Sequence, residues 1–374
     1  MRKKAKNLAI SITFLALFMF LTNPSFSGDR SPLSIEEDDL IEMIERSGPL
    51  IFLHSQEKFF MDDPEYVLDK GSSLQWGIVE NDRNYNSFET KRVMTMPTSS
   101  KTLLEDVRII EEAIQASPDM ENYKYWIHID ENTMKPGSQS RAKAFIRALP
   151  ATPVTTEIQF WFFYPFNGPG RVEVCAASTM CDDNWLSQTG RHFGDWEHVS
   201  LLFSNITKEL TSVYMSRHDG SETFDRDQNG VFRSSSNPKR VLQFEGSHPV
   251  IYSAVSSHAH YPKQGNKHKY KRVFSKKWGL GTASADLFDC TAPSIPFKTF
   301  EPGSYKLVSS AFPNIHVEEP GWLDFKGRWG QYEKLLDKIK FAHPKLKVYT
   351  YTDIGKGPSG PKQKKSWEGD FQPR

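Results

Sequence analysis

Arg191-His192-Phe193-Gly194-Asp195-Trp196-Glu197-His198 is followed directly by Val199-Ser200-Leu201-Leu202-Phe203. The apolar second half of this stretch predicts a β-strand from Asp195 to Phe203. Alternate side chains of a strand share a face, so Asp195 and Glu197 point the same way as Val199. Two carboxylates therefore lie on the face that becomes core. A buried carboxylate without a partner is strongly unfavourable, so the fold must supply basic side chains or a bound metal ion.

Both ways of neutralising these carboxylates stay open at this stage. Arg or Lys side chains would fix the register of the strand and do nothing more. A divalent cation would instead use the carboxylates as ligands, with His192 and His198 as neighbouring imidazoles.

A second pair of imidazoles supports the metal site. His258 and His260 share a face if a strand reaches them, and at this spacing a strand offers two ligands to one ion. Taken alone, a His-x-His pair more often belongs to a surface or a core. The predicted mixed shell suits Zn, Mn or Mg, and Ca less well, and consists of His192, Asp195, Glu197, His258 and His260.

A basic segment without acidic residues lies just downstream. It contains Lys263, Lys267, Lys269, Lys271, Arg272, Lys276 and Lys277. Beside a metal site, such a segment favours an anionic ligand such as a phosphate or a lipid headgroup. A solvated basic loop explains it equally well. The candidate ligand-binding residues are Lys263, Lys267, Lys269 and Arg272.

The first residues predict export. An apolar run from Leu8 to Leu21 is preceded by Arg2, Lys3, Lys4 and Lys6 and followed by Ser25-Phe26-Ser27. This pattern is typical of a secretory signal peptide, here residues 1–27. The apolar run is shorter than the roughly 20 residues that span a bilayer. We therefore expect a secreted product, extracellular or periplasmic, with no transmembrane segment after cleavage.

Charge and cysteine content fit that expectation. Removal of residues 1–27 takes away four basic residues, which turns the net charge of +1 into −3, and nothing in this balance predicts nucleic-acid binding. Export permits disulfides, and the chain has three cysteines. Cys175 and Cys181 flank a short loop and are the favoured pair, which leaves Cys290. The other pairings, and three free thiols, stay open.

The pattern of apolar residues predicts a mainly β protein. Helices are expected over residues 34–46 and 99–116, with a buried strand at 50–54 and loops over 70–100. Short runs of aromatic and β-branched residues then predict strands at 123–129, 142–148, 155–165, 195–203, 210–216, 250–260 and 305–310. This spacing is typical of an antiparallel β-sandwich, here with N-terminal and C-terminal helical additions.

One large domain accounts for the mature chain up to residue 354. Residues 158–164 are apolar on both faces and predict a central strand. Residues 322–340 are expected to be partly helical. Residues 355–374 are rich in Gly, Pro and Lys, which predicts a disordered basic tail.

Several ordered motifs resemble the vacuolar protein sorting-associated protein 62 family. They cover residues 48–329 and comprise Ile51-Phe52-Leu53-His54, Glu57-Lys58-Phe59-Phe60, Gln159-Phe160-Trp161-Phe162-Phe163-Tyr164-Pro165-Phe166-Asn167-Gly168, Gly194-Asp195-Trp196-Glu197-His198-Val199, Pro249-Val250-Ile251-Tyr252-Ser253 and His258-Ala259-His260-Tyr261-Pro262. The family is named for a sorting phenotype in yeast, and its biochemical activity is poorly defined. The resemblance therefore implies a fold and a site more than a function.

The run from His192 to Glu197 is also similar to the central heptapeptide region of the necrosis- and ethylene-inducing cytolysins. Those proteins are β-sandwiches that hold a divalent cation and bind plant sphingolipid sugars. The resemblance implies cation ligands at His192, Asp195 and Glu197, with Asp183 near a further acidic position. This chain departs from the pattern at Phe193 and Gly194 and is considerably longer, which argues against membrane damage.

Three functions follow from these patterns. The first is recognition of a polar or anionic glycan or lipid headgroup at a divalent-cation site, in a toxin-like manner and at a membrane surface. The second is a metal-dependent hydrolase of phosphoesters, with Glu197 or His198 as the base. The third is a non-catalytic sorting adaptor, in which the polar cluster serves stability alone. The chain has no Gly-x-Ser-x-Gly, phosphate-binding Gly loop or His-Glu-x-x-His motif.

Overall fold

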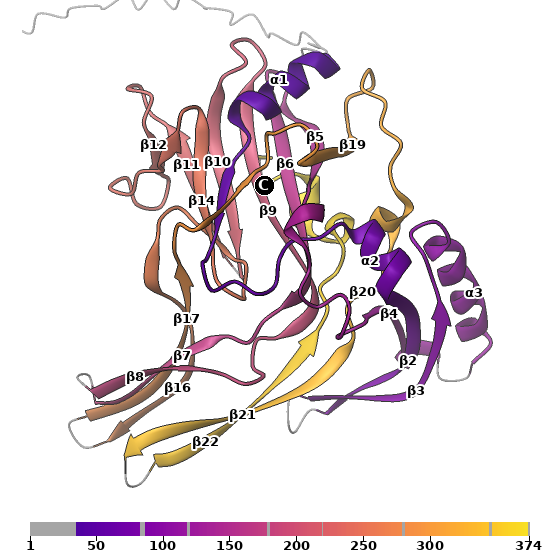
Figure 1. Cartoon of the computed structure of the whole chain (residues 1–374), viewed down its shortest axis with the longest axis vertical. Helices are drawn as coiled ribbons and strands as arrows, with labels where there is room; N and C mark the ends of the chain where they lie inside the picture. The colour runs from indigo at the N-terminus through magenta and orange to yellow at the C-terminus, as the bar shows by residue number, and fades with distance from the viewer. Residues whose placement is uncertain are drawn as a thin grey trace, which may run out of the picture. The chain divides into compact units, whose positions relative to one another are not determined.

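The computed structural model describes residues 35–82, 87–117, 120–177, 180–218, 220–278, 281–343 and 346–372. These residues belong to one compact unit, residues 32–374, coloured by chain position in Figure 1. The predicted signal peptide lies outside the described residues. Among the described helices, none has both the length and the apolar character that crossing a membrane requires.

A seven-stranded sheet forms the centre of the unit. Its strands are β5 (Ala144–Thr152), β6 (Thr155–Asn167), β9 (His192–Ser204), β10 (Leu210–Arg217), β11 (Gly220–Arg226), β12 (Phe232–Ser234) and β19 (Tyr305–Ser310). They lie in the order β12-β11-β10-β9-β6-β5-β19. β6 is buried along almost its whole length, which confirms the predicted central strand. β9, the strand of the opening sequence stretch, is paired on one side with β6 and on the other with β10.

One face of this sheet packs against a five-stranded sheet and the first helix. That sheet contains β1 (Leu50–Leu53), β13 (Phe244–Glu245), β14 (His248–Ser253), β15 (His260–Tyr261) and β18 (Ile295–Lys298), and the helix is α1 (Glu37–Ser47). The shared core is formed by alternate residues of the strands, such as Ile251 of β14 and Val199, Leu201 and Phe203 of β9. The apolar second half of β9 therefore points where the sequence predicted.

The opposite face of the seven-stranded sheet is covered by an aromatic core. It contacts a sheet of β2 (Ser72–Asp82), β3 (Ser87–Pro97), β4 (Tyr123–Ile129) and β20 (Arg328–Trp329), and helices α2 (Pro64–Gly71) and α3 (Leu103–Gln115). The 3-10 turn η3 (Gly321–Asp324) contributes Trp322 and Leu323 to it, whereas the turns η1 (Met120–Asn122) and η2 (Gln139–Arg141) contain no buried residue. Trp161 and Trp196 project from the central sheet into this core, where Trp196 stacks on Trp322 at 5.3 Å.

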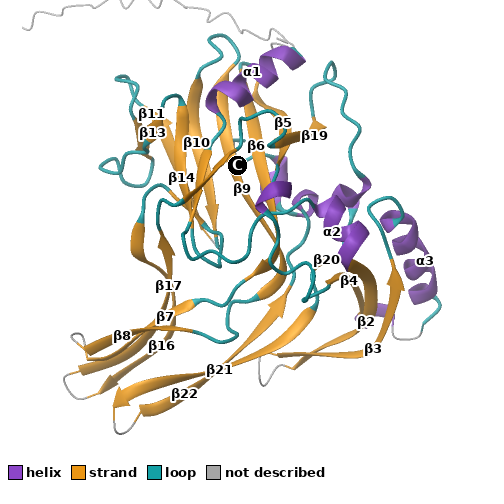
Figure 2. Cartoon of the chain, viewed as in Figure 1, coloured by secondary structure: helices purple, strands orange, loops and turns teal. Residues whose placement is uncertain are grey.

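Two further sheets pack on each other through a separate apolar cluster. One contains β7 (Arg171–Ala177), β8 (Met180–Trp185), β16 (Gly265–Trp278) and β17 (Gly281–Thr291), and the other is the hairpin of β21 (Tyr332–His343) and β22 (Leu346–Lys356). Their common core includes Val172, Leu287 and Ile339. We call these six strands the accessory lobe; Figure 2 shows them as the long strands that extend from the central sheet.

The structure confirms the mainly β class but corrects two details of the predicted architecture. The β1·β14, β19·β5 and β20·β4 pairs are parallel, so the strands are not all antiparallel. The predicted C-terminal helix over 322–340 is wrong beyond the single 3-10 turn η3, because residues 332–343 pair with 346–356 as a hairpin. Burial in that segment has a period of two: Leu335, Asp337, Ile339 and Phe341 are buried, and the residues between them are exposed.

The predicted disorder of residues 355–374 is also wrong for residues 355–372. They form the 3-10 turns η4 (Pro361–Gln363) and η5 (Lys365–Glu368), which contribute Trp367 to the aromatic core with 3% of its surface exposed. Composition alone is misleading here, because one buried Trp and a few hydrogen bonds hold a segment that is otherwise rich in Gly, Pro and Lys. We call residues 361–372 the C-terminal strap.

Candidate functional site

Strand alternation in β9 separates the polar residues of the opening stretch into two groups. Asp195 and Glu197 line a cleft of about 1000 Å³ on one side of the sheet. Trp196 and His198 point to the other side, where His198 stacks on Trp161 at 4.3 Å. Adjacent residues of a strand point to opposite faces of the sheet, so their side chains cannot contact the same ligand. The predicted catalytic pair of Glu197 and His198 is therefore not brought together.

His192 lines the same cleft although it is three residues from Asp195. In a regular strand an odd spacing would place the two side chains on opposite faces. Gly194 lies between them in the left-handed region, with φ of +64°, and this turns the backbone over. A Cβ on Gly194 would lie 1.8 Å from the carbonyl oxygen of Trp329, so no larger residue fits here.

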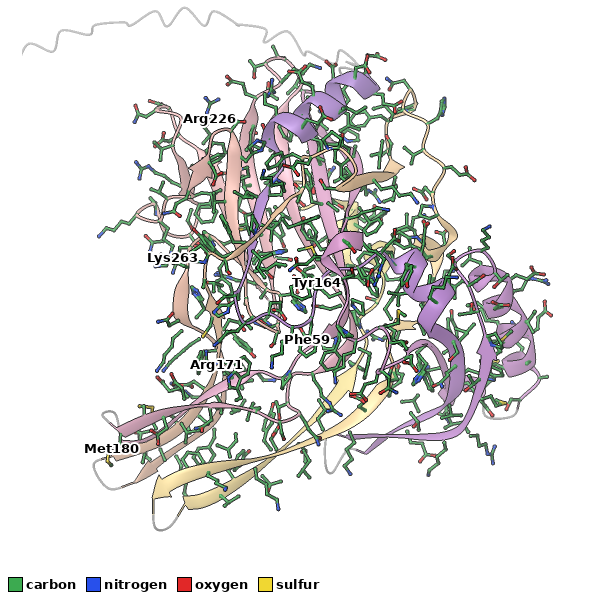
Figure 3. All side chains as sticks on the ribbon, viewed as in Figure 1. Phe59, Tyr164, Arg171, Met180, Arg226 and Lys263 are labelled. Carbon is green, nitrogen blue, oxygen red and sulfur yellow. A yellow bond between two sulfur atoms is a disulfide. The ribbon has the colours of Figure 1, made fainter. Side chains whose placement is uncertain are left out.

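Asp195 is neutralised by His258, a residue far away in the sequence. Its Oδ2 lies 3.1 Å from Nδ1 of His258, while Nε2 of the same imidazole lies 3.1 Å from the carbonyl oxygen of Phe59. Both ring nitrogens face acceptors, so both carry a proton and His258 is an imidazolium. The second carboxylate near it is Glu57, at 3.9 Å. His258 stacks on Tyr164 at 3.7 Å, and Tyr164 and Phe59 are both labelled in Figure 3.

The electrostatics of this pair follow from its burial. Burial disfavours the charge of the imidazole, but the hydrogen bond from His258 to Asp195 and the charge of Glu57 raise the pKa of His258. Burial likewise opposes the charge of Asp195, and the hydrogen bond from His258 and the charge of His192 lower its pKa. An imidazolium has no lone pair to offer a metal ion. His258 therefore acts on Asp195 as a counter-ion.

Glu197 lies in a different environment two residues further on. Its Oε2 accepts a hydrogen bond of 2.7 Å from Oγ of Ser216 in β10. Burial raises the pKa of the Glu197 carboxyl, and the negative charge of Asp195 raises it further. Neighbouring carboxylates with opposite pKa shifts are typical of functional sites, and of structural ion-pair networks as well.

His260 does not join the cleft. Its Nδ1 donates to the carbonyl oxygen of His198 at 3.3 Å, and its ring meets the edge of Phe162 at 5.6 Å. Complete burial lowers the pKa of His260 to about 3, so the imidazole is neutral. The β14–β15 segment passes over the apolar face of β6 at this point, which places His260 in the core.

The predicted five-residue shell is therefore not gathered around one point. Within the described ranges, one trio of ligand atoms lies within 4.8 Å of one another: Glu173, Cys175 and Cys181. Those two cysteines form a disulfide, as the sequence favoured, and Cys290 is buried as a free thiol.

His192 has the orientation of a metal ligand. Its Nδ1 donates to the carbonyl oxygen of Gly194 at 2.7 Å, which leaves Nε2 for another partner.

Comparison with known proteins gives this chain a family. The family model for vacuolar protein sorting-associated protein 62 matches residues 115–371. The chain belongs to this family. A relative in Saccharomyces cerevisiae, vacuolar protein sorting-associated protein 62, is 28% identical over an alignment of 216 residues, and the match covers 53% of this chain and 39% of that protein. The match thus spans about two-fifths of the length of this curated relative.

One solved structure is also similar. It is the crystal structure of necrosis- and ethylene-inducing protein 2 from the causal agent of cocoa's witches' broom disease. The match is 16% identical, covers 37% of this chain and 52% of that protein, and has a TM-score of 0.23. At this level no residue role is transferred from one protein to the other.

The basic segment of this Vps62-family chain is only partly available for an anion. Lys263, Lys267 and Lys269 line the cleft, as the sequence predicted. Lys267 is paired with Glu173 at 2.8 Å and Asp183 at 2.9 Å, and Lys269 is also paired with Glu173. Arg272 lies outside the cleft lining and binds Asp286 through two hydrogen bonds. The acidic partners come from β7, β8 and β17, so the segment's own composition could not reveal them.

The structure adds cleft residues that sequence reasoning missed. They are Arg217, His218, Glu222, Arg240, His268 and Tyr270 among others. His218 is bound by the buried carboxylate of Asp289 at 2.7 Å. Burial disfavours its charge, but the hydrogen bond and charge of Asp289 raise the pKa of His218. The positions of Arg217 and His218 just after the predicted strand 210–216 were the available signal, whereas Glu222 and Arg240 carried none.

Proposed function

We propose that this Vps62-family chain is a secreted protein built on a β-sandwich, which recognises a polar or anionic glycan or lipid headgroup in the cleft beside β9. The observation that carries the proposal is the convergence of His192, Asp195 and Glu197 on one polar cleft of about 1000 Å³. A cleft of this size lined by unlike charges fits a ligand with many hydroxyl or charged groups better than an apolar one.

A divalent cation, of Zn, Mn, Mg or Ca, completes the proposed site. Nε2 of His192 and the carboxylate of Glu197 are its ligands, with the carboxylate oxygen of Asp195 that His258 does not hold. His258 and His260 are left out, because the first is an imidazolium and the second is in the core. The ligand atoms must move closer together when the ion binds, since they are not within 4.8 Å of one another as a set.

Elemental analysis tests the cation. The wild type, Glu197→Gln and His192→Asn are each purified, exchanged into metal-free buffer and reloaded with Zn or Mn. The number of metal ions bound per chain is then measured for each protein. The exposed residues Glu318 and His316 supply matched controls, Glu318→Gln and His316→Asn. We expect about one ion per chain in the wild type and both controls and a clear loss in both site variants. Equal metal content in all five proteins would contradict the cation site.

Ligand recognition is tested separately. Glycan arrays and liposomes are probed with the wild type and Glu197→Gln, each with and without chelator. We expect binding that chelator and Glu197→Gln both reduce. Binding that neither treatment changes would remove the cation from the recognition mechanism. Absence of binding to every glycan and lipid would leave the hydrolase and the sorting adaptor as the remaining candidates.

A metal-dependent phosphoester hydrolase is the second candidate. It is favoured by the presence of Glu197 and the Asp289-bound His218 in the lining of one cleft, where either group can exchange a proton with a water or a leaving group. His218 takes the role of base that the sequence assigned to His198, because His198 points to the other face of the sheet. Turnover of phosphomonoesters or phosphodiesters with added Mn or Zn, lost in His218→Asn, would establish it, since a binding protein turns nothing over.

A further inference from the structure

Two arginines of the cleft share one buried carboxylate. Glu222 accepts hydrogen bonds from Nη1 of Arg240 at 2.9 and 3.1 Å and lies 3.3 Å from Nη1 of Arg217. It also accepts a hydrogen bond of 2.7 Å from Oγ of Ser234. The side chain of Glu222 is 1% exposed, against 28% for Arg217 and 47% for Arg240. One negative charge therefore holds two guanidinium groups, and the cluster keeps a net positive charge toward the cleft.

The fold places this cluster next to the proposed cation site. Arg217 ends β10, and the preceding residue, Ser216, donates the hydrogen bond to Glu197. Glu222 lies in β11 opposite Met215, so the β10–β11 hairpin sets the carboxylate beneath the arginine. Arg240 follows β12, with its carbonyl oxygen bound by the backbone N–H of Ser234 at 3.0 Å.

Lys263 adds a third cation to the same cleft. Its backbone carbonyl oxygen is fixed by Oγ1 of Thr291 at 3.0 Å, while its side chain has no ion pair among the described residues. In this it differs from Lys267 and Lys269, whose charges are balanced by Glu173, Asp183 and Asp286. Lys271 also lines the cleft without an ion pair among the described residues, so the unbalanced positive charge of the cleft lies with Arg217, Arg240, Lys263 and Lys271.

We propose that Arg217, Arg240 and Lys263 form a subsite for the phosphate group of the ligand, so that the cleft takes a phosphorylated polar molecule. Guanidinium groups suit this because their parallel N–H donors match two phosphate oxygens, and a neighbouring ammonium adds charge without fixed direction. Glu222 positions the guanidinium groups and does not contact the phosphate. This inference rests on the proposed function and names the class of ligand for the same cleft.

Binding of inorganic phosphate and of glycerol phosphate, measured by calorimetry with glycerol as the uncharged comparison, tests the subsite. The variants are Arg240→Gln and Lys263→Met, and the matched controls are Arg108→Gln on the exposed face of α3 and Lys276→Met on β16. We expect affinity for glycerol phosphate to fall by at least about tenfold in each variant and to stay unchanged in the controls. Lys263→Met keeps every ion pair of the described residues, so it tests the subsite even if Arg240→Gln does not fold.

The outcomes separate this subsite from the proposed function itself. Equal affinity for glycerol and glycerol phosphate, or unchanged phosphate affinity in Lys263→Met, would overturn the subsite, while chelator-sensitive glycan binding would leave the proposed function standing. Vesicles of phosphatidylcholine with and without phosphatidic acid distinguish a membrane source of the phosphate from a soluble one. Competition between these vesicles and free glycerol phosphate, lost in Lys263→Met, would support the same subsite.

Discussion

Gly194 is the residue on which the shape of the cleft depends. Its positive φ places His192 on the same side as Asp195, and its missing side chain lets the β20 backbone approach. Only glycine takes this conformation without cost, because the Cβ of any other L-residue meets its own carbonyl. A single residue therefore joins the site strand to the aromatic core and sets the direction of a candidate ligand.

We predict that Gly194→Ala destabilises the protein more than a left-handed glycine alone would require. Gly246→Ala is the matched control, since Gly246 has φ of +61° and no atom within 4 Å of the added Cβ. The control should lose about 1–2 kcal/mol from backbone strain, and Gly194→Ala should lose at least about 2 kcal/mol more, because Trp329 must move. Urea unfolding of both variants measures the difference. Equal losses of unfolding free energy in the two variants would mean that Trp329 moves away from the added Cβ at no cost in stability.

His258 shows which features of the site residue spacing can predict and which it cannot. The spacing of the histidines correctly directed attention to a segment that meets Asp195, yet the imidazole supplies charge and not a lone pair. The carbonyl oxygen of Phe59 decides this, because it forces a proton onto Nε2. A backbone carbonyl from a distant loop has no signature in the sequence, so the role of His258 could not be predicted from its neighbours along the chain.

At the scale of elements, apolar strands were predictable and polar hairpins were not. β4, β6, β9 and β19 carry runs of aromatic and β-branched residues, and the structure has them close to where they were expected. The β2–β3, β16–β17 and β21–β22 hairpins were missed, because charged residues fill their exposed faces and hide the two-residue period. β2 and β17 also pair with β4 and β7, whereas β21 and β22 form a sheet of two strands.

The C-terminal strap is the element whose contacts were least visible in the sequence. Nε2 of His198 and Oγ of Ser200 donate to Oδ2 of Asp370 at 2.9 and 2.6 Å, and the backbone N–H of Asp370 donates to Glu157 at 2.9 Å. The side chain of Asp370 has no exposed surface. The strap therefore closes the back of β9, directly behind the two carboxylates of the cleft.

We predict that Asp370→Asn lowers the free energy of unfolding by about 1.5–3 kcal/mol, the range for a hydrogen-bonded charged group. The exposed Glu368 in the same strap supplies the control, Glu368→Gln, which should change it little. Chemical denaturation followed through tryptophan fluorescence measures both, since the buried Trp367 lies in the same strap. Equal stability of the two variants would show that the charge of Asp370 contributes nothing to folding.

On the scale of the whole molecule, a carboxylate of β21 ties the β21–β22 hairpin of the accessory lobe to the candidate site. Asp337 of β21 accepts hydrogen bonds from the backbone N–H and Oγ of Ser187 at 2.8 and 2.6 Å and from the backbone N–H of Thr189. These residues belong to the loop that leads directly into His192. The lobe was absent from the sequence prediction, so this link between a distant hairpin and the cleft could not be anticipated.

The pH dependence of stability should reveal this link. Burial disfavours the charge of Asp337, but the hydrogen bonds from Ser187 and Thr189 outweigh burial and lower its pKa. A carboxyl with a lowered folded pKa stabilises the fold fully above its unfolded pKa of about 3.9 and loses that contribution as pH falls through the folded value. We therefore expect the protonation of Asp337 to lower the stability of the protein below about pH 4.

We predict that Asp337→Asn is less stable than the wild type at pH 7 by about 1.5–3 kcal/mol and that the difference shrinks below about pH 4. The control is Asp182→Asn, at an exposed position of β8 in the same lobe, which should follow the wild type at every pH. Thermal unfolding across this pH range gives the curves. Because Asp337 orients the loop before His192, the variant should also bind the cation and the phosphate probe more weakly at pH 7. A variant that lost stability but kept both affinities would show that the β21–β22 hairpin and the cleft are independent.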